Sequence, residues 1–335
     1  MVLRGGFPKA PKSTPVRLTG RNSFAGDLAV FGSDSRVSLA TFSYRAFGLN
    51  VRSELECSGI LGGDGVPDVH VRLGRVPEQL EGAKAAGVFY QAAPGQLLLN
   101  VPHVARYLIS AGNEIVIDLS PTADRGMVLL LLFGSAFGAL LHQRGVLAIH
   151  GSAIVTRHGA VVFAGASGYG KSTIAGAFYR RGFAVLADDV CPISTIGLPI
   201  VLPGNPFLML WSEAVNRLGI DGQHLRRARS SLEKYILPLG DGFAVEPVRL
   251  HSIYVLEPSN PDDFTLIPAH GLQKMKTLNL ATYRPQFVDG MELDSQHFRQ
   301  IGEVARHAKV TIVRRPRGGF RVDELADLLA ADFSA

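Results

Sequence analysis

A glycine-rich stretch in the middle of the chain has the residue types and the spacing that bind the phosphates of a nucleotide. Residues 165–172 read GASGYGKS and match the pattern G-x-x-x-x-G-K-[S/T]. Glycines permit backbone conformations that turn consecutive N–H groups toward phosphate oxygens. Lys171 can reach the β- and γ-phosphates, and the Ser172 hydroxyl can coordinate Mg²⁺. We therefore predict that this loop binds ATP and Mg²⁺. The residues expected at the phosphates are Gly165, Ala166, Ser167, Gly168, Tyr169, Gly170, Lys171, Ser172 and Thr173.

The segments on either side of this loop are those that the pattern requires. The apolar residues 160–165 predict a strand immediately before the loop, and residues 171–181 predict a helix immediately after it. A helix that begins at the loop adds the positive end of its dipole to a phosphate site. The alternative is a glycine-rich turn that carries a surface lysine.

Two adjacent carboxylates follow the loop after one helix and one strand. The segment FAVLADDV places Asp188 and Asp189 at the end of an apolar strand. One carboxylate there can bind Mg²⁺, directly or through water, and the other can accept the proton of an attacking hydroxyl. The alternative is an aspartate pair that caps the next segment. The pair favours catalysis over a nucleotide-dependent switch, because a switch needs no general base.

A histidine precedes the loop by one predicted hairpin. Residues 145–165 predict two strands joined by a turn at residues 157–159. In such a hairpin His150 lies at the end far from the turn, beside the phosphate loop. A lone histidine is more often a structural residue than a catalytic one, so the hairpin alone leaves both roles open.

Three of these features together resemble one known family. They are the pair His150-Gly151, the loop GASGYGKS and the segment RRGFAVLADDV, and they cover residues 145–193. In type and spacing they are similar to the catalytic domain of HPr kinase/phosphorylase. The resemblance implies an α/β (α+β) class and the phosphate-loop fold that this family shares with phosphoenolpyruvate carboxykinase. It also implies a homo-oligomer.

The same resemblance implies a role for each residue. Lys171 would act on the transferred phosphate, Ser172 and Asp189 would serve Mg²⁺, and Asp188 would be the general base on the acceptor hydroxyl. His150 would lie near the transferred phosphoryl group and assist charge or proton handling. The sequence departs from the family where it has no glutamate directly after Ser172 and no second glycine-rich signature.

The whole chain is more similar to the HPr-kinase-like proteins encoded with lasso peptide biosynthesis genes. The similar segments are YRAFGLNVRSEL, LHQRGVLAIHGSAI and LPGNPFLMLWSEAVNRLGI. Members of that branch phosphorylate a serine at or near the C-terminus of a precursor peptide. The resemblance implies the same reaction here, with a precursor peptide or small protein as partner. The alternatives are a serine kinase/phosphorylase for a phosphocarrier protein, a non-catalytic nucleotide-binding switch and a small-molecule kinase.

The segment after the aspartates offers candidates for binding the acceptor. The prolines and glycine of residues 203–206 exclude a regular central strand and predict a loop that leads to an apolar helix. Trp211 is either one wall of a peptide groove or a core anchor. A basic cluster that follows could close over ATP or bind a peptide carboxylate, or it could be a solvated face. Its members are Arg226, Arg227, Arg229 and Lys234.

Composition limits the class of protein. The chain has 335 residues, 47% apolar residues and a net charge of +5, enough apolar residues for a real core but no motif for binding nucleic acid. The apolar run 127–141 is shorter than a membrane span and predicts a buried helix, so we expect no membrane and a cytoplasmic location. We predict a basic flexible arm over residues 1–21, a strand-rich domain over 22–122 and the ATP-binding catalytic domain over 123–335.

Overall fold

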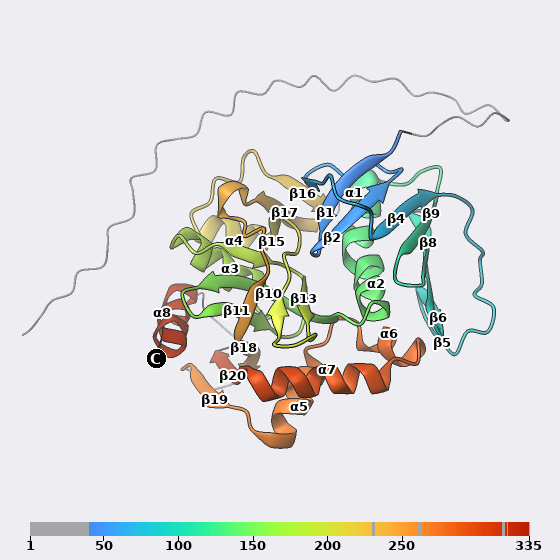
Figure 1. The fold of residues 1–335 in the computed structure, drawn as a ribbon. Helices are drawn as coiled ribbons and strands as arrows, with labels where there is room; N and C mark the ends of the chain where they lie inside the picture. Colours follow the sequence, from blue (N-terminus) through green and yellow to red (C-terminus); the bar gives the residue numbers. More distant parts are fainter. Residues whose placement is uncertain (1–39, 230–231, 260–262, 317–318, 320, 335) are drawn as a thin grey trace, which may run out of the picture. The chain divides into compact units, whose positions relative to one another are not determined.

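The computed structural model describes residues 40–229, 232–259, 263–316, 319 and 321–334 (Figure 1). Residues Thr41–Ala335 form one compact unit of mixed α/β architecture, and its N-terminal part is rich in strands. The arm predicted over residues 1–21 lies outside the described residues. The boundary predicted between residues 122 and 123 stays a prediction.

The described N-terminal residues form a nine-stranded sheet. Its strands, in spatial order, are β3 (Leu61–Gly62), β1 (Phe42–Ala46), β2 (Leu49–Ser53), β4 (Val69–Leu73), β9 (Glu114–Leu119), β8 (Ala105–Ser110), β7 (Gln96–Val101), β6 (Tyr90–Ala93) and β5 (Ala85–Gly87). Strand β8 alternates buried and half-buried side chains, as a sheet with one covered face requires. Tyr107 and Ile109 are fully buried in the resulting core.

One long apolar helix covers this sheet. It consists of α1 (Arg125–Leu131), a π-helical turn η1 (Leu132–Ala136) and α2 (Phe137–Gln143), and it includes the run predicted to be a buried helix. By length and composition it could span a membrane, but 72% of its apolar window is buried inside the protein. Its N-cap is Asp124, whose side chain accepts a hydrogen bond from the backbone of Met127 at 2.8 Å.

A second sheet, of eight described strands, carries the glycine-rich loop. Its strands run β11 (Gly159–Ala164), β10 (Leu147–Thr156), β13 (Val190–Ser194), β14 (Ile200–Val201), β18 (Val248–Ser259), β20 (Lys309–Pro316) and β19 (Thr265–Pro268), with β12 (Val185–Ala187) beside β10. β10 and β11 form the predicted hairpin, in which Thr156 pairs with Gly159 and Gly151 with Ala164. β18 is parallel to both β11 and β20, and this places the loop after β11 beside the ends of two further strands.

Helices pack on both faces of this second sheet. α3 (Lys171–Arg180) and α8 (Val322–Ser334) contribute to the core that contains Phe163 and Tyr254. α5 (Gly271–Leu280) and α7 (Asp294–His307) contribute to the core that contains Val162 and Ile253. Neighbouring residues of one strand therefore point into different cores, as the alternation of a strand requires. The short helix α6 (Pro285–Gly290) packs against the N-terminal sheet.

A third sheet occupies the segment predicted to be a loop followed by a helix. Its described strands, in order, are β15 (Phe207–Trp211), β17 (Leu232–Pro238) and β16 (Arg226–Arg229), with α4 (Ser212–Arg217) after β15 and a 3₁₀ turn η2 (Gly240–Gly242) after β17. The expected loop ends at Pro206, and a strand rather than a helix follows it. A strand is possible there because Pro203 and Pro206 both precede β15 and so remove no N–H donor from that strand.

Candidate active site

The glycine-rich loop joins β11 directly to α3. Gly165 adopts a positive φ of 136°, and a Cβ there would lie 2.7 Å from the backbone oxygen of Leu256 on the neighbouring β18. Gly170 is the N-cap of α3 with φ 91°, in the left-handed region. Both positions require glycine because a side chain would clash or strain the backbone. The predicted strand, loop and helix therefore follow one another as the phosphate-binding pattern requires.

Lys171 begins α3 and folds back over the loop. Its Nζ donates a hydrogen bond to the backbone oxygen of Ala166 at 2.9 Å, and the residue is only 6% exposed. Burial lowers the pKa of Lys171 to about 8, and the nearby charges of Asp189 and Asp188 offset part of that effect. A buried ammonium with one backbone partner is suited to exchange that partner for a phosphate oxygen.

Asp188 lies beneath the loop and is almost fully buried. Its Oδ1 accepts hydrogen bonds from the hydroxyls of Ser152, at 2.6 Å, and Ser172, at 2.8 Å. Its Oδ2 accepts from the backbone N–H of Met209 at 2.7 Å. Burial raises the pKa of Asp188, although these hydrogen bonds favour its ionised form. The hydroxyl predicted to bind Mg²⁺ is therefore tied to a buried carboxylate.

Asp189 has different surroundings, although it is the next residue. It has a φ of 64°, which turns its side chain away from that of Asp188, and 28% of that side chain is exposed. Its Oδ1 lies 3.6 Å from Nε2 of His150, because the pairing of β10 with the β12–β13 segment brings the two residues together. Burial tends to raise the pKa of Asp189, but the interaction with His150, together with the charges of Lys234 and Lys171, outweighs it and holds the pKa below its ordinary value.

Tyr283 and the π-helical turn lie next to His150 and Asp189. The Tyr283 ring meets the His150 ring edge-on at a centroid distance of 5.6 Å. A Cβ at Gly134 would lie 3.3 Å from Oη of Tyr283 and 4.0 Å from Oδ2 of Asp189. The glycine in the π-helical turn thus allows the helix backbone to approach both side chains closely.

One small cavity, of about 60 Å³, brings most of the predicted residues together. His150, Asp189 and Lys234 face it from three different segments. The loop residues that line it are Ser167, Gly168, Gly170, Lys171, Ser172 and Thr173. Gly165, Ala166 and Tyr169 do not line it, since Gly165 packs against β18 and Tyr169 faces a neighbouring cavity.

That neighbouring cavity is larger, about 320 Å³, and shares Gly168, Gly170, Thr173 and Trp211 with the small one. Tyr169 also lines the larger cavity. Trp211 is 44% exposed and also borders the smaller cavity, so it is a wall of the site and the core-anchor alternative was wrong. Arg315, at the end of β20, lines the larger cavity, and its buried Nε has no hydrogen-bond partner among the described residues.

Arg315 and Ser152 were not among the residues predicted from the sequence. Arg315 ends an apolar strand that runs parallel to β18, next to the loop, and arginine at such a strand end is the signal that could have identified it. Ser152 lies two residues after His150 and carried no signal of its own. Its relation to Asp188 depends on how β10 pairs with the segment around β12.

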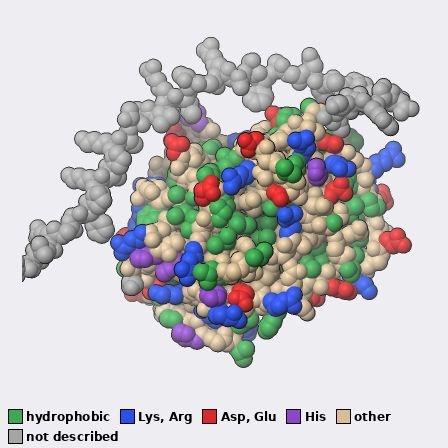
Figure 2. All heavy atoms as spheres, in the orientation of Figure 1, with side chains coloured by type: hydrophobic (Ala, Val, Ile, Leu, Met, Phe, Trp, Pro, Cys, Tyr) green, Lys and Arg blue, Asp and Glu red, His purple; other side chains and the backbone are tan. Residues whose placement is uncertain are grey.

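The predicted basic cluster does not act as one group. Lys234 lies on β17 and faces the small cavity, with its Nζ 6.0 Å from the Trp211 ring centre. Arg227 lies over the ring of Tyr235, and Arg226 lines a third cavity on the far side of Asp189. Arg229 ends β16, and its side chain lies outside the described part of the structure. On the face drawn in Figure 2, basic and acidic side chains are interspersed.

No family model matches this sequence, and no curated protein matches it. Among solved structures, one match is the Hpr(Ser) kinase/phosphatase from Coxiella burnetii. The match has 13% sequence identity and a TM-score of 0.32, and it covers 56% of this chain and 95% of that chain.

Proposed function

We propose that this protein is an ATP- and Mg²⁺-dependent kinase that transfers the γ-phosphoryl group to a serine hydroxyl of a peptide or small protein. One observation carries the proposal. A single cavity joins a glycine-rich loop at a helix N-terminus to a half-buried pair of carboxylate and imidazole, Asp189 and His150. The loop supplies what phosphates need, and the pair supplies what a hydroxyl nucleophile needs.

The loop side of the cavity fits a triphosphate with its metal. The backbone N–H groups of residues 165–173, Lys171 and the start of α3 would hold the phosphates. The Ser172 hydroxyl lines the cavity and would bind Mg²⁺, and the Asp188 carboxylate, 2.8 Å from it, would orient that hydroxyl toward the ion. Among the described residues no group of three or more His, Cys, Asp or Glu could hold a metal ion. Bound Mg²⁺ would neutralise charge on the phosphates.

The surroundings of the two aspartates favour a division of roles opposite to the one that the resemblance implied. Asp188 already accepts three hydrogen bonds and is 3% exposed, so an acceptor hydroxyl could not approach it. Asp189 is open to the cavity and close to His150. We therefore assign the metal side to Asp188 and the general base to Asp189, with His150 positioning it.

These groups account for every bond and proton of the phosphoryl transfer. The acceptor hydroxyl gives its proton to Asp189, and its oxygen bonds to the γ-phosphorus as the bond to the β–γ bridging oxygen breaks, which leaves ADP. Lys171 and Lys234 face the same cavity and would stabilise the negative charge on the transferred group.

For the acceptor we propose a precursor peptide, on the resemblance of three chain segments to the lasso-associated branch. A phosphocarrier protein is the second candidate. The test is mass spectrometry after incubation with ATP, Mg²⁺ and the precursor peptide encoded beside this gene, with HPr in a parallel tube. One added phosphate on the peptide alone supports the proposal. Phosphate on HPr alone would indicate that the acceptor is a phosphocarrier protein. ATP binding without either product would favour a non-catalytic nucleotide-binding switch.

Nucleotide binding can be measured separately because the chain has one tryptophan. Trp211 borders both the small and the large cavity, so its fluorescence should change when MgATP binds. Lys171→Met should weaken that binding by about tenfold or more, since a charged hydrogen bond to phosphate is lost. Lys84→Met, on an exposed residue of the N-terminal sheet region, should leave it unchanged. Equal affinity in both variants would contradict the assignment of the loop.

A further inference from the structure

A third cavity, about 90 Å³ in volume, lies on the other side of Asp189 from the phosphate loop. Asp189 and Met209 line both this cavity and the small one described above, so the two cavities adjoin at the proposed general base. Most of its other walls are apolar: Leu129 and Leu130 of α1 on one side and Ile236 of β17 on the other. A group bound here would lie next to the atoms that react.

Besides Asp189, the polar residues in these walls are Ser58 and Arg226, which are exposed, and Asn205, which is buried. Asn205 is 5% exposed, and its buried Oδ1 has no hydrogen-bond partner among the described residues. A buried amide oxygen without a hydrogen-bond partner lowers the stability of the fold by about 1–3 kcal/mol, unless a ligand supplies the missing hydrogen bond. An amide side chain offers both a donor and an acceptor, which are what the peptide group of a bound chain requires.

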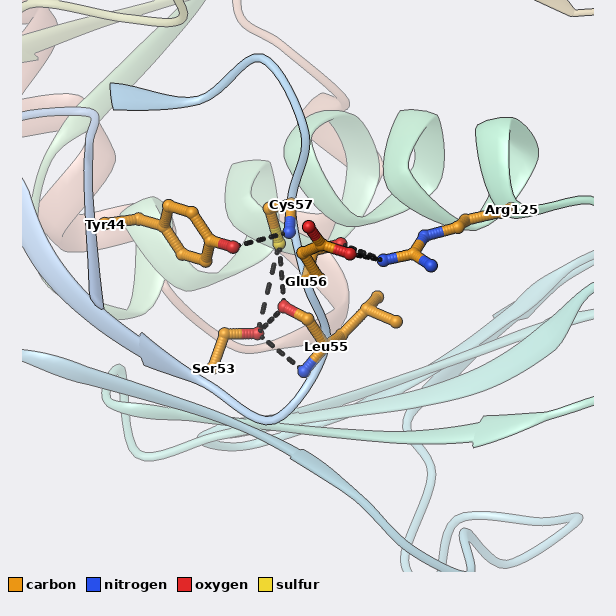
Figure 3. Close-up of polar contacts among 6 residues, drawn as sticks. All are labelled: Tyr44, Ser53, Leu55, Glu56, Cys57 and Arg125. Carbon is orange, nitrogen blue, oxygen red and sulfur yellow. Dashed lines mark hydrogen bonds and ion pairs between the residues drawn. The ribbon is translucent and has the colours of Figure 1, made fainter. Parts of the chain in front are cut away.

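The N-terminal sheet region supplies another wall of this cavity. Residues 58–60 line it, and hydrogen bonds hold the segment before them in place (Figure 3). The Cys57 N–H donates to the hydroxyl of Tyr44 at 2.8 Å, and the Arg125 guanidinium at the start of α1 donates to both the backbone oxygen and the carboxylate of Glu56. Burial raises the pKa of Cys57 to about 12, so this thiol serves as a buried structural group. These hydrogen bonds therefore fix this wall of the cavity to helix α1.

We propose that this cavity binds the acceptor, taking an apolar side chain that neighbours the reactive serine, while Asn205 bonds to the peptide group between them. This inference rests on the proposed kinase function and names the substrate class for it: a peptide with a large aliphatic or aromatic residue within one or two positions of the serine. The mixed lining suits such a segment, because the apolar walls bind the side chain and the one buried amide orients the backbone.

The test uses the neighbouring helix residues Leu130 and Leu131 as a matched pair. Both are half-buried, but Leu130 lines the cavity, whereas Leu131 packs against the core of the N-terminal sheet. The probes are fluorescein-labelled seven-residue peptides with a central serine, flanked by Ala, Leu, Phe or Trp. Their binding is measured by anisotropy with Mg²⁺ and a non-hydrolysable ATP analogue, so the readout needs no phosphoryl transfer.

The wild-type protein should bind Leu peptides about tenfold more tightly than Ala peptides, from burial of the added carbons. Leu130→Ala should shift the preference toward Phe or Trp by about tenfold, and Leu131→Ala should leave it unchanged. Asn205→Leu should weaken all peptides by a similar factor, about tenfold, without changing the order of preference. The same order and ratios of affinity in Leu130→Ala as in wild type would overturn the inference, and so would weaker peptide binding with the nucleotide analogue than without it.

The same peptides, incubated with ATP, separate this inference from the proposed function. Phosphorylation with a preference that Leu130→Ala does not change would overturn the cavity assignment and keep the kinase. Binding with the expected shift in preference, but without transfer to any peptide, would overturn the kinase and keep the cavity as a peptide site. Phosphorylation that follows the binding preference in wild type, Leu130→Ala and Leu131→Ala supports both the kinase function and the cavity assignment.

Discussion

Nε2 of His150 lies 3.6 Å from Oδ1 of Asp189, at the point where the phosphate cavity and the third cavity meet. The two residues come from the first strand of the hairpin and from the turn after β12, and backbone pairing joins them: the Gly151 N–H donates to the backbone oxygen of Asp189 at 3.2 Å. Their relative position is therefore set by the sheet. This pair is where the chemistry proposed above is most sensitive to substitution.

Asp189→Asn should reduce phosphoryl transfer by about 10²–10⁴-fold while leaving MgATP binding within a few-fold of wild type. Asparagine is the appropriate replacement because it tolerates the left-handed φ of 64° at this position, whereas Ala would add strain. Transfer is measured with labelled ATP, and binding by Trp211 fluorescence. Transfer at near-normal rate would contradict the assignment of Asp189 as general base.

Asp188→Asn should act mainly on folding and metal binding. Its amide nitrogen would face a donor, either the Met209 N–H or the two serine hydroxyls, because the wild-type carboxylate accepts from all three. We expect a loss of unfolding free energy of about 1–3 kcal/mol and weaker Mg²⁺-dependent nucleotide binding. Urea unfolding and Mg²⁺ titrations of both variants test the contrast. A stable Asp188→Asn protein that binds MgATP normally but cannot transfer phosphate would restore Asp188 as the base.

The addition of one methyl group at Gly138 should reduce both stability and activity. A Cβ at this position would lie 2.7 Å from the ring of Tyr283, which is buried and packs against His150. Gly138→Ala should lower the unfolding free energy by about 1–3 kcal/mol and slow transfer, because the ring must move. Gly302→Ala on α7 is the matched helical control: nothing lies within 4 Å of its Cβ. It should be neutral or stabilising by up to about 1 kcal/mol. Equal effects of the two variants would argue against close packing at Tyr283.

Stability should fall between neutral and acidic pH because of His142. This buried imidazole shares a hydrogen bond with the backbone oxygen of Tyr283 at 2.8 Å, and burial lowers its pKa to about 4. As the pH falls below about 6.5, the unfolded chain takes up a proton that the folded protein accepts only near pH 4. The unfolding free energy should therefore decrease over that range, by up to about 3 kcal/mol, with the largest loss at the acidic end.

Urea unfolding at pH 7 and pH 5 measures this dependence. The variant His142→Gln keeps a donor for Tyr283 and should show a smaller decrease than wild type. His224→Gln, at an exposed position, should keep the wild-type decrease. Burial also lowers the pKa of His297, so some decrease should remain in every variant. An unchanged pH dependence in His142→Gln would show that another group is responsible.

Local sequence was sufficient for the elements that carry the chemistry. The hairpin of β10 and β11, the loop, α3 and the aspartate pair after β12 were all predicted where the structure has them. Each depends on interactions between near neighbours: glycines that allow positive φ, a helix that begins at a glycine N-cap, and apolar runs of strand length. The hairpin also carried one tertiary consequence, since its register alone places His150 beside the loop.

Only the tertiary structure decided which role each of those residues can take. The register between β10 and β12 buries Asp188 against Ser152 and leaves Asp189 open to the cavity, and nothing in the pair DD distinguishes them. The third sheet brings Trp211 and Lys234 to the loop and carries Arg226 away from it. Arg315 and Asn205 reach their cavities from distant parts of the chain. Such contacts depend on which apolar faces are buried together, and that is a property of the whole packed core rather than of any local pattern.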